Sequence, residues 1–249
     1  MQLTKINGKY DLYLPEHRAA REQWAIENGG WEVERIEEMV RLIKPHDIVF
    51  DIGTEEGDIS ALIAKYTGCD MVLFEPNDRV WPCIREIWNA NGLKRPLNFF
   101  PGFLSSKTDP NTVVSFVDSL NIPIAGQVIP DHGFKQLYEN YPDVPQITMD
   151  DYCSIHKIYP TVITMDVEGS EFEVIRGAEK TLRERKPIIF MSVHPEFMFD
   201  SYRNEGKWKE MYGERQHVVH MLRFISELGY TYRVIEWDYH ECHFRFDPK

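Results

Sequence analysis

The sequence predicts an α/β fold, with a mainly parallel sheet and helices on both of its faces. Short apolar runs alternate with amphipathic segments along the chain, which is the pattern of βαβ units. Polar residues end several of these runs, and glycines follow the first of them. Because ligands of parallel α/β sheets bind beyond the carboxyl ends of the strands, those polar residues predict a binding site.

The first hundred residues contain five expected elements after an N-terminal extension. The opening 30 residues are polar and irregular in pattern, and residues 31–43 show one apolar helical face. Residues 1–44 are therefore predicted to form a helical extension. The elements expected next are a strand at 48–50, a helix at 59–66, a strand at 71–74, a helix at 80–91 and a strand at 97–100.

The rest of the chain continues the alternation after an irregular stretch. The expected elements are a strand at 162–167, a helix at 171–185, a strand at 188–193, a helix at 217–228, and strands at 230–237 and 242–246. The length of 249 residues suits one domain, 1–249. Residues 103–147 and 197–214 are predicted to be insertions near the active site, because long irregular segments in compact domains are usually functional.

The composition argues against a nucleic-acid-binding protein and against a membrane protein. The formal net charge is −12 and no long basic run occurs, which argues against a nucleic-acid partner. No stretch approaches the roughly 18 apolar residues that a membrane span needs. Four scattered cysteines and an N-terminus without an apolar signal region lead us to expect a cytoplasmic protein. The oligomeric state stays open, with a homo-oligomer as one option.

The segment DIGTEEG is the first candidate for ligand binding. Asp51 ends a strand, Gly53 allows a tight turn, and Gly57 allows close backbone approach at the start of a helix. A dinucleotide site would have the spacing GxGxxG, whereas the spacing here is DxGxxxG. Glu55 and Glu56 would repel a pyrophosphate and would suit a cationic ligand group. The alternative is a glycine-rich turn that binds nothing.

Two further acidic positions extend the candidate site. Glu75 follows the next strand, where a carboxylate can accept both ribose hydroxyls of an adenosyl group. In MDVEGSEFEVIRGAEKTL, Asp166 and Glu168 flank one valine at a strand end, so both are placed to face the ligand. The alternative is that Glu168 and Glu171 only favour the N-terminus of the following helix.

Together, DIGTEEGDIS, FEPN, ITMDDY and MDVEGSEFEVIRGAEKTL resemble the FkbM family of S-adenosylmethionine-dependent methyltransferases, in order and spacing, from about residue 45 to residue 195. The resemblance implies a Rossmann-like class I methyltransferase fold: a mainly parallel seven-stranded sheet with a C-terminal antiparallel strand. Members typically O-methylate hydroxyls, often on sugars of glycans or on natural products. The residues then expected to contact the cofactor are Asp51, Gly53, Glu55, Gly57, Glu75 and Asn77. Asp166 and Glu168 match the acids of the family's methyl-transfer centre.

The chain departs from the family pattern at two places. The family often has Ala-Asn where this chain has Thr54-Glu55. Many members also place a glutamate after the strand at 188–193, where this chain has His194.

His194 is the first candidate for the general base, because imidazole titrates near neutrality, and Asp166 is the second. A strand-end histidine is alternatively a hydrogen-bonded structural residue. A divalent metal, Mg²⁺ or Mn²⁺, is another route to an activated hydroxyl, with Asp166, Glu168 and His194 as its ligands.

The function expected from these features is O-methylation of a sugar, sugar nucleotide or glycan, as in polysaccharide biosynthesis. The partner is then a small-molecule saccharide rather than a nucleic acid. Two alternatives stay open. One is methylation of a lipid, polyketide or other natural product, and the other is a non-catalytic adenosyl-binding protein of the same fold.

Overall fold

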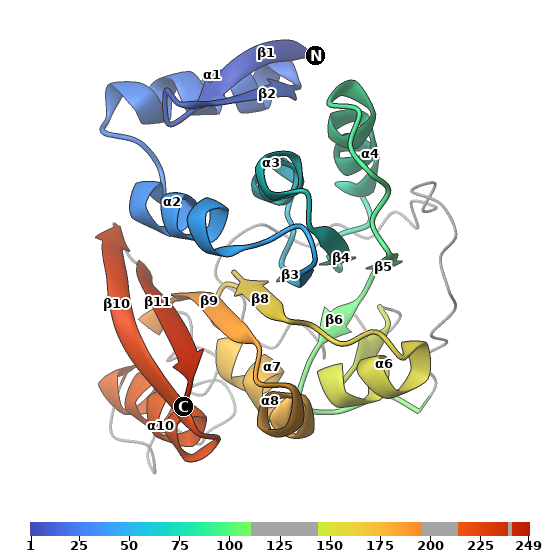
Figure 1. Cartoon of the computed structure of the whole chain (residues 1–249), viewed down its shortest axis with the longest axis vertical. Coiled ribbons are helices and arrows are strands. Elements are labelled where there is room, and N and C mark those ends of the chain that lie inside the picture. The colour runs from blue at the N-terminus through green and yellow to red at the C-terminus, as the bar shows by residue number, and fades with distance from the viewer. Residues whose placement is uncertain (111–143, 196–213, 239–240) are drawn as a thin grey trace.

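The computed structural model describes residues 1–110, 144–195, 214–238 and 241–249, and a seven-stranded sheet forms its centre (Figure 1). The strand order is β10-β11-β9-β8-β3-β4-β5. The neighbours from β9 to β5 are paired in parallel, whereas β11 runs antiparallel to both β9 and β10. The strands are β3 (Ile48–Ile52), β4 (Asp70–Phe74), β5 (Asn98–Phe100), β8 (Val162–Met165), β9 (Ile188–Val193), β10 (Tyr230–Asp238) and β11 (Glu241–Pro248).

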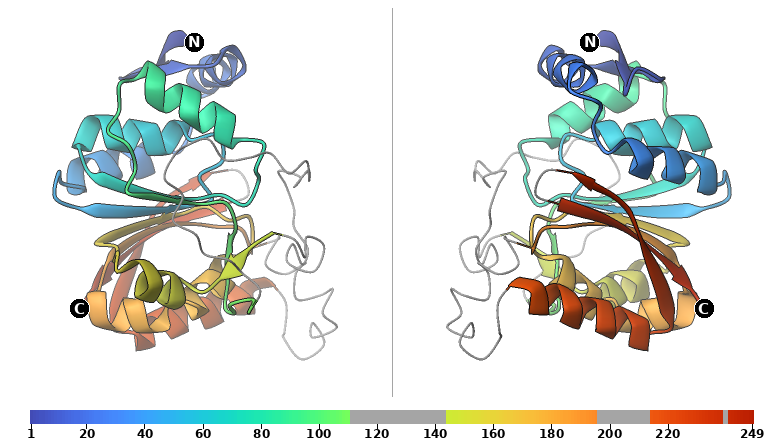
Figure 2. Two further views of the ribbon diagram at one scale, coloured as in Figure 1. Left: turned by 90° about the vertical axis from the view of Figure 1, so that its right-hand side faces the viewer. Right: turned by 90° about the vertical axis from the view of Figure 1, so that its left-hand side faces the viewer.

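Helices cover both faces of this sheet (Figure 2). One layer contains α1 (Glu16–Glu27), α2 (Val33–Leu42), α3 (Asp58–Thr67) and α4 (Trp81–Ala90). The other contains α6 (Met149–His156), α7 (Glu171–Arg176), α8 (Glu179–Arg185) and α10 (Glu214–Glu227). The prediction of a seven-stranded α/β sheet between two helical layers is confirmed. Within the described residues, no helix combines the length and the hydrophobicity needed to cross a membrane.

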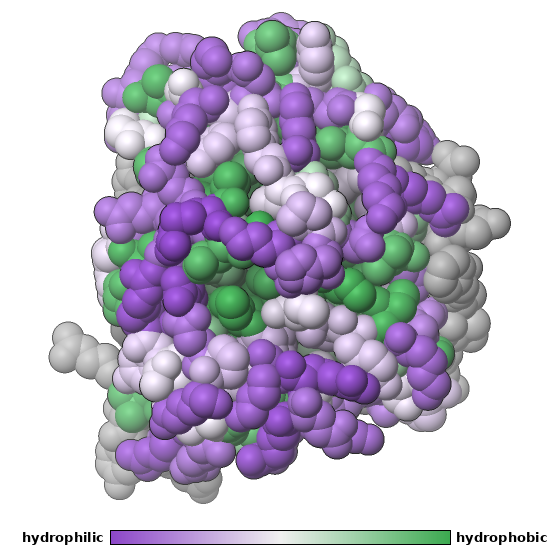
Figure 3. Space-filling view, in the orientation of Figure 1, coloured by the Kyte–Doolittle hydropathy of each residue, from purple (hydrophilic) through white to green (hydrophobic). Residues whose placement is uncertain are grey.

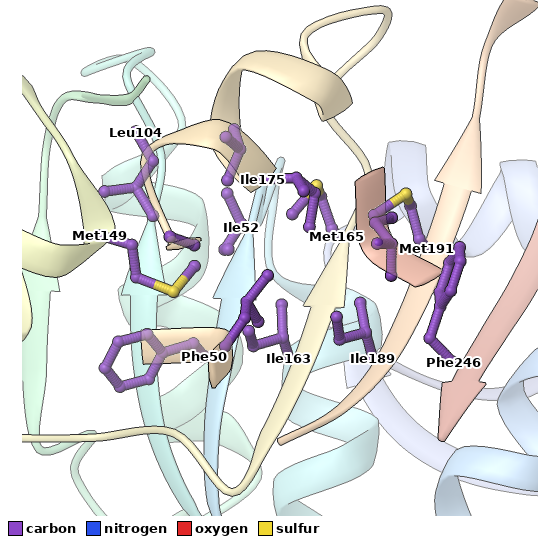
Figure 4. Packing of buried hydrophobic residues seen from close by; sticks show 14 of the residues in the cluster. Phe50, Ile52, Leu104, Met149, Ile163, Met165, Ile175, Ile189, Met191 and Phe246 are labelled. Atoms are coloured by element: carbon purple, nitrogen blue, oxygen red, sulfur yellow. The ribbon is translucent and has the colours of Figure 1, made fainter. Parts of the chain in front are cut away.

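Alternating side chains of the strands build one core on each face of the sheet. Phe50 and Ile163 point into the core shared with α6, α7 and α10 (Figure 4). Val49 and Val162 belong to the core shared with α2, α3 and α4. Figure 3 shows hydrophobic residues gathered across the middle of one face of the molecule, in the band where Figure 1 draws the sheet. This alternation places every second strand residue beside α2 and α3.

The register brings the ends of several strands to one edge, which we call the carboxyl edge. Ile52 of β3 pairs with Phe74 of β4 and with Met165 of β8, so the segments that follow leave the sheet side by side. Because β11 runs antiparallel to β9, it begins at this same edge, where Cys242 pairs with Val193. The carboxyl edge therefore collects residues from both halves of the chain.

The N-terminal segment differs from its prediction. Residues expected to be irregular form a hairpin of β1 (Gln2–Ile6) and β2 (Tyr10–Leu14), which precedes α1. Asn7 and Gly8 in its turn adopt positive φ angles of 49° and 68°. An Asn-Gly pair is a strong hairpin signal because both residues tolerate this conformation. The hairpin was therefore readable from the sequence.

The middle of the chain also differs in detail. The helix expected at 171–185 is divided into α7 and α8 at Gly177, where a Cβ atom would lie 1.9 Å from the carbonyl oxygen of Ser105. Glycine is needed there for close backbone approach. Helix α6, which was not predicted, begins at Thr148, whose hydroxyl accepts the N–H of Asp151 at 3.0 Å.

The proposed insertions are only partly described. At the ends of the first, β6 (Phe103–Leu104) and β7 (Gln146–Ile147) pair in a separate two-stranded sheet. Residues 111–143 and 196–213, which contain most of both insertions, lie outside the described residues. Their role and the single-domain organisation of residues 1–249 stay predictions.

If the hairpin shares the core of the sheet, truncating its buried face should destabilise the whole chain. Leu12 is 0% exposed in that core, so Leu12→Ala is expected to lower the free energy of unfolding by about 2–5 kcal/mol. Leu3→Ala, on the same hairpin but 55% exposed, is the control and should cost less than about 0.5 kcal/mol. Denaturant unfolding measures both, and equal costs would show that the hairpin folds apart from the sheet.

Candidate active site

The glycine loop, residues 51–57, leaves β3 in close contact with the end of β8. Gly53 has a φ of 81°, and a Cβ atom there would lie 1.8 Å from the carbonyl oxygen of Asp166. Gly57, with a φ of 85°, caps the start of α3. Gly53 is therefore required both for its backbone conformation and for its distance from β8. This contact places the loop directly beside the acidic segment that follows β8.

The carboxylate of Asp51 is turned toward α3. It is buried and accepts a hydrogen bond from the Ser60 hydroxyl, while the Thr54 hydroxyl donates to the Asp51 carbonyl oxygen at 3.2 Å. Burial raises the pKa of Asp51, although the hydrogen bond from Ser60 opposes the change. Asp51 thus stabilises the loop from within, and its contact with a cofactor stays a prediction.

Glu75, which directly follows β4, is held in place by two backbone N–H groups. Glu55 N donates to its Oε2 at 2.9 Å, and Asn77 N donates to its Oε1 at 2.8 Å. Burial raises the pKa of Glu75 to about 8, even though both N–H groups favour the charged form. Each carboxylate oxygen has two lone pairs, so one on each is left for a ligand hydroxyl. This geometry fits the predicted ribose contact.

The two glutamates inside the glycine loop are turned toward α1. The Glu55 carboxylate accepts hydrogen bonds from Arg18 at 3.1 and 3.2 Å and from Arg21 at 3.2 Å. Glu56 lies 2.8 Å from His17 Nε2. Because α1 already pairs these acids, their charge is less available to a cationic ligand, and the contact of Glu55 with a cofactor stays a prediction. Glu55 contributes through its backbone N–H instead.

Four carboxylates surround His194, which follows β9 and is 5% exposed. Its Nδ1 lies 2.8 Å from Glu171 Oε1, and its Nε2 lies 3.1 Å from Glu241 Oε2. The same Nε2 is 3.6 Å from Asp166 Oδ1 and 3.8 Å from Glu168 Oε2. The structure thus brings together the three expected catalytic residues, Asp166, Glu168 and His194, with two more acids.

The contacts of His194 favour its protonated, positively charged form. Burial alone would lower its pKa, but the hydrogen bond with Glu171, the nearby Glu241 carboxylate and the charge of Asp166 raise it to about 12. Both ring nitrogens face carboxylates, and both can donate only in the protonated ring. These contacts argue against an imidazole that titrates near neutrality, and the role of His194 as the general base stays a prediction.

Asp166, unlike His194, has a partly exposed side chain that can accept a proton. Burial raises its pKa well above the usual range, and the charges of Glu241 and Glu32 add to this effect while His194 opposes it. Its side chain is 29% exposed as a whole, and its buried Oδ1 is without a hydrogen-bond partner among the described residues. Asp166 is thus a partly accessible carboxyl group with a raised affinity for protons.

Several residues at this edge escaped the sequence analysis. Arg35 is buried in α2, where it pairs with Glu32 and donates to the Thr164 hydroxyl at 2.8 Å. Its spacing of four from Met39 on the apolar face was a usable signal. Glu241 could have been placed only by recognising that the last strand begins at the carboxyl edge. Glu171 was considered solely as a helix-terminal charge.

Two groups of side chains at this edge are close enough to share a metal ion: Asp166, Glu168 and His194, and Glu32, Glu241 and His243. In the first group, His194 Nε2 lies 3.1 Å from Glu241 Oε2 and would have to lose its proton before it could ligate a metal. In the second, the Arg35 guanidinium already pairs with Glu32. Both groups would therefore have to rearrange before they could bind a metal ion, and a metal at this edge stays a prediction.

Comparisons with known proteins identify the family of the chain. The model of the FkbM methyltransferase domain matches residues 51–232. Methyltransferase FkbM from Methylobacillus flagellatus KT has a similar structure, with a TM-score of 0.51, 15% sequence identity, and coverage of 82% of this chain and 44% of that chain. The chain therefore spans less than half the length of that protein.

Two other solved structures extend the comparison. The ribosomal protein L11 methylase from Lactobacillus delbrueckii subsp. bulgaricus has 10% identity, a TM-score of 0.49, and coverage of 87% of this chain and 77% of that chain. Precorrin-6y C5,15-methyltransferase from Geobacter metallireducens GS-15 has 11% identity, a TM-score of 0.46, and coverage of 96% and 94%. No curated protein matches the chain. Because the matched residues span the glycine loop, Glu75, Asp166 and His194, the chain belongs to the FkbM family of S-adenosylmethionine-dependent methyltransferases.

Proposed function

We propose that this chain transfers the methyl group of S-adenosylmethionine to a hydroxyl of a sugar, sugar nucleotide or glycan. One observation carries the proposal: Gly53 packs against the backbone of Asp166. This contact holds the loop whose Glu55 N–H orients Glu75 beside the acidic segment after β8. This arrangement supports a nucleoside site beside a proton acceptor on a class I methyltransferase fold.

The residues of the edge suit the cofactor in distinct ways. Glu75 offers one lone pair on each oxygen to the ribose hydroxyls. Gly53 and Gly57 leave the backbone of the loop open to close approach, and Asn77 orients Glu75 through its N–H. When bound, the cofactor supplies an electrophilic methyl group on a sulfonium.

Asp166 is the proposed general base. As the bond from the acceptor oxygen to the methyl carbon forms and the carbon–sulfur bond breaks, Asp166 takes the hydroxyl proton. The raised pKa makes it a stronger proton acceptor than an ordinary aspartate. Glu168, partly exposed beside His194, orients the acceptor hydroxyl. His194 is a fixed cation that holds these acids together, and alignment of the reacting atoms provides most of the rate enhancement.

The saccharide class rests on what FkbM-like sequences typically methylate. A lipid, polyketide or other natural product is the second candidate, and a non-catalytic adenosyl-binding protein is the third. The partly exposed Asp166 and Glu168 favour an enzyme over the third candidate, because a binding protein has no need of a proton acceptor. The net charge of −12 and the scattered cysteines favour a cytoplasmic enzyme acting on a small molecule.

The proposed function is tested first by cofactor binding and methyl transfer. The chain should bind S-adenosylhomocysteine in calorimetry and should transfer a labelled methyl group to at least one hydroxyl in a panel of saccharides and sugar nucleotides. Lipid and polyketide acceptors belong in the same panel. Absence of binding at millimolar ligand would contradict the proposal, and transfer only to lipids or polyketides would move the acceptor to the second candidate.

Asp166→Asn separates the chemical step from cofactor binding. The variant is expected to lower kcat by about 10²- to 10⁴-fold, because the hydroxyl proton loses its acceptor. Its affinity for S-adenosylhomocysteine should stay within about threefold of the parent, well below the tenfold that 1.4 kcal/mol represents. Glu168→Gln is the matched control and should slow transfer less. An unchanged kcat in Asp166→Asn would remove Asp166 from the mechanism.

The pKa of Glu75 predicts a pH dependence of nucleoside binding. The neutral ligand 5′-methylthioadenosine should bind best above pH 8, where Glu75 is charged and its oxygens accept the ribose hydroxyls. Below pH 8 the Glu75 carboxyl group must lose its proton when the ligand binds, so the affinity should fall by up to about tenfold for each pH unit of acidification. Calorimetry from pH 6 to 9 measures this. Glu75→Gln should bind more weakly with a flat profile, and an equal slope in both proteins would exclude Glu75 as its source.

A further inference from the structure

Arg18 of α1 gathers three acids of the glycine loop and the start of α3. Its guanidinium pairs with the buried carboxylate of Asp58 and donates to both oxygens of Glu55, at 3.1 and 3.2 Å. Its Nε also lies 3.3 Å from Glu56 Oε2. Arg18 is itself only 5% exposed. A single buried side chain from the N-terminal segment therefore contacts two glutamates of this loop and the first residue of α3.

Arg18 and Asp58 stabilise each other's charged forms in this group. Burial would lower the pKa of Arg18, but the charges of Asp58 and Glu55 raise it above its usual value. Burial would raise the pKa of Asp58, but Arg18 lowers it. Both groups are therefore ionised, and removing the guanidinium would leave the buried Asp58 without its partner.

Glu55 links Arg18 to Glu75, the proposed ribose-binding residue. Glu55, whose carboxylate binds Arg18, has a positive φ of 51°, which is uncommon for a residue other than glycine. In this conformation its N–H points at Glu75 and donates to Oε2 at 2.9 Å. Arg18 holds the Glu55 side chain, and the Glu55 backbone holds the Glu75 carboxylate.

We propose that Arg18 is a positioning residue for the cofactor, through which the N-terminal helix sets the orientation of Glu75. The inference rests on the proposed function. Arg18 lies outside the stretch that matches the family model, which begins at residue 51. Its partner Glu55 stands where FkbM-like sequences often have asparagine. The pair is therefore a feature of this chain beyond the family motif.

The competing explanation is that Arg18 only anchors α1 to the rest of the molecule. The N-terminal segment has a second anchor that does not touch the loop: the Asn91 side chain bonds to both Tyr13 N and Tyr13 O at 2.9 Å. Asn91→Ala therefore removes an anchor of the same segment and serves as the matched control. If anchoring were the whole role of Arg18, both variants would act alike.

The experiment measures 5′-methylthioadenosine binding by calorimetry on the full chain. Arg18→Met should weaken binding by about tenfold or more, the coupling typical of a shared hydrogen-bond network. Arg18→Lys, which keeps the charge but loses the two-pronged contact, should fall between Arg18→Met and the parent. Asn91→Ala should stay within about twofold of the parent, even where its melting temperature falls. In turnover assays, Arg18→Met should raise the KM for S-adenosylmethionine more than it lowers kcat.

A double-mutant cycle completes the test. Because Arg18 acts through Glu55, adding Glu55→Gln to Arg18→Met should weaken binding no further than Arg18→Met alone. Equal affinity changes in Arg18→Met and Asn91→Ala, or additive effects in the cycle, would overturn the proposal. Circular dichroism checks that each variant folds. If Arg18→Met does not fold, the affinities of Arg18→Lys and Glu55→Gln for 5′-methylthioadenosine are compared with that of Asn91→Ala instead. Failure of the parent chain to bind would contradict the proposed function instead.

Discussion

Neutralisation of buried carboxylates at the carboxyl edge of the sheet is the constraint on which the rest of this structure depends. Parallel strands end there with acids, and burying an unpaired charge costs several kcal/mol. Three buried cations meet this cost: Arg18 in α1, Arg35 in α2 and His194 after β9. Each comes from a different part of the chain, so the helices of the N-terminal half are part of the site as well as of the core.

The same arrangement divides the acids into roles. Acids that face a cation closely, such as Asp58 against Arg18, stay ionised and hold structure. Glu75 and Asp166, where burial outweighs compensation, have raised pKa values and exchange protons more readily. Environments that push the pKa values of neighbouring acids apart are typical of sites that run acid–base chemistry. His194 is one of the cations that these acids surround, and its raised pKa favours the charged ring.

Local patterns were sufficient for most of the sheet and for the positions of the strand-end acids. Apolar runs located β3, β4, β8 and β9, and the rule for parallel sheets placed Glu75 and Asp166 at one edge. The charge of His194 could not be predicted, because it depends on Glu241, which arrives at the edge on an antiparallel strand. The direction of the Glu55 side chain depends on Arg18, in a segment whose hairpin the periodicity analysis overlooked. Both features depend on contacts between residues far apart in the sequence, which local periodicity does not report.

The central claim is that His194 is a permanent cation and that a carboxylate removes the proton. Long-range ¹H–¹⁵N spectra of the histidine-labelled full chain, with His194 assigned by comparison with His194→Gln, report the protonation of each ring nitrogen. The structure predicts that both nitrogens of His194 stay protonated from pH 6 to about pH 9, far above the usual histidine pKa of about 6.5. A neutral His194 ring at pH 7 would contradict this account and would make the imidazole, rather than Asp166, the acceptor of the hydroxyl proton.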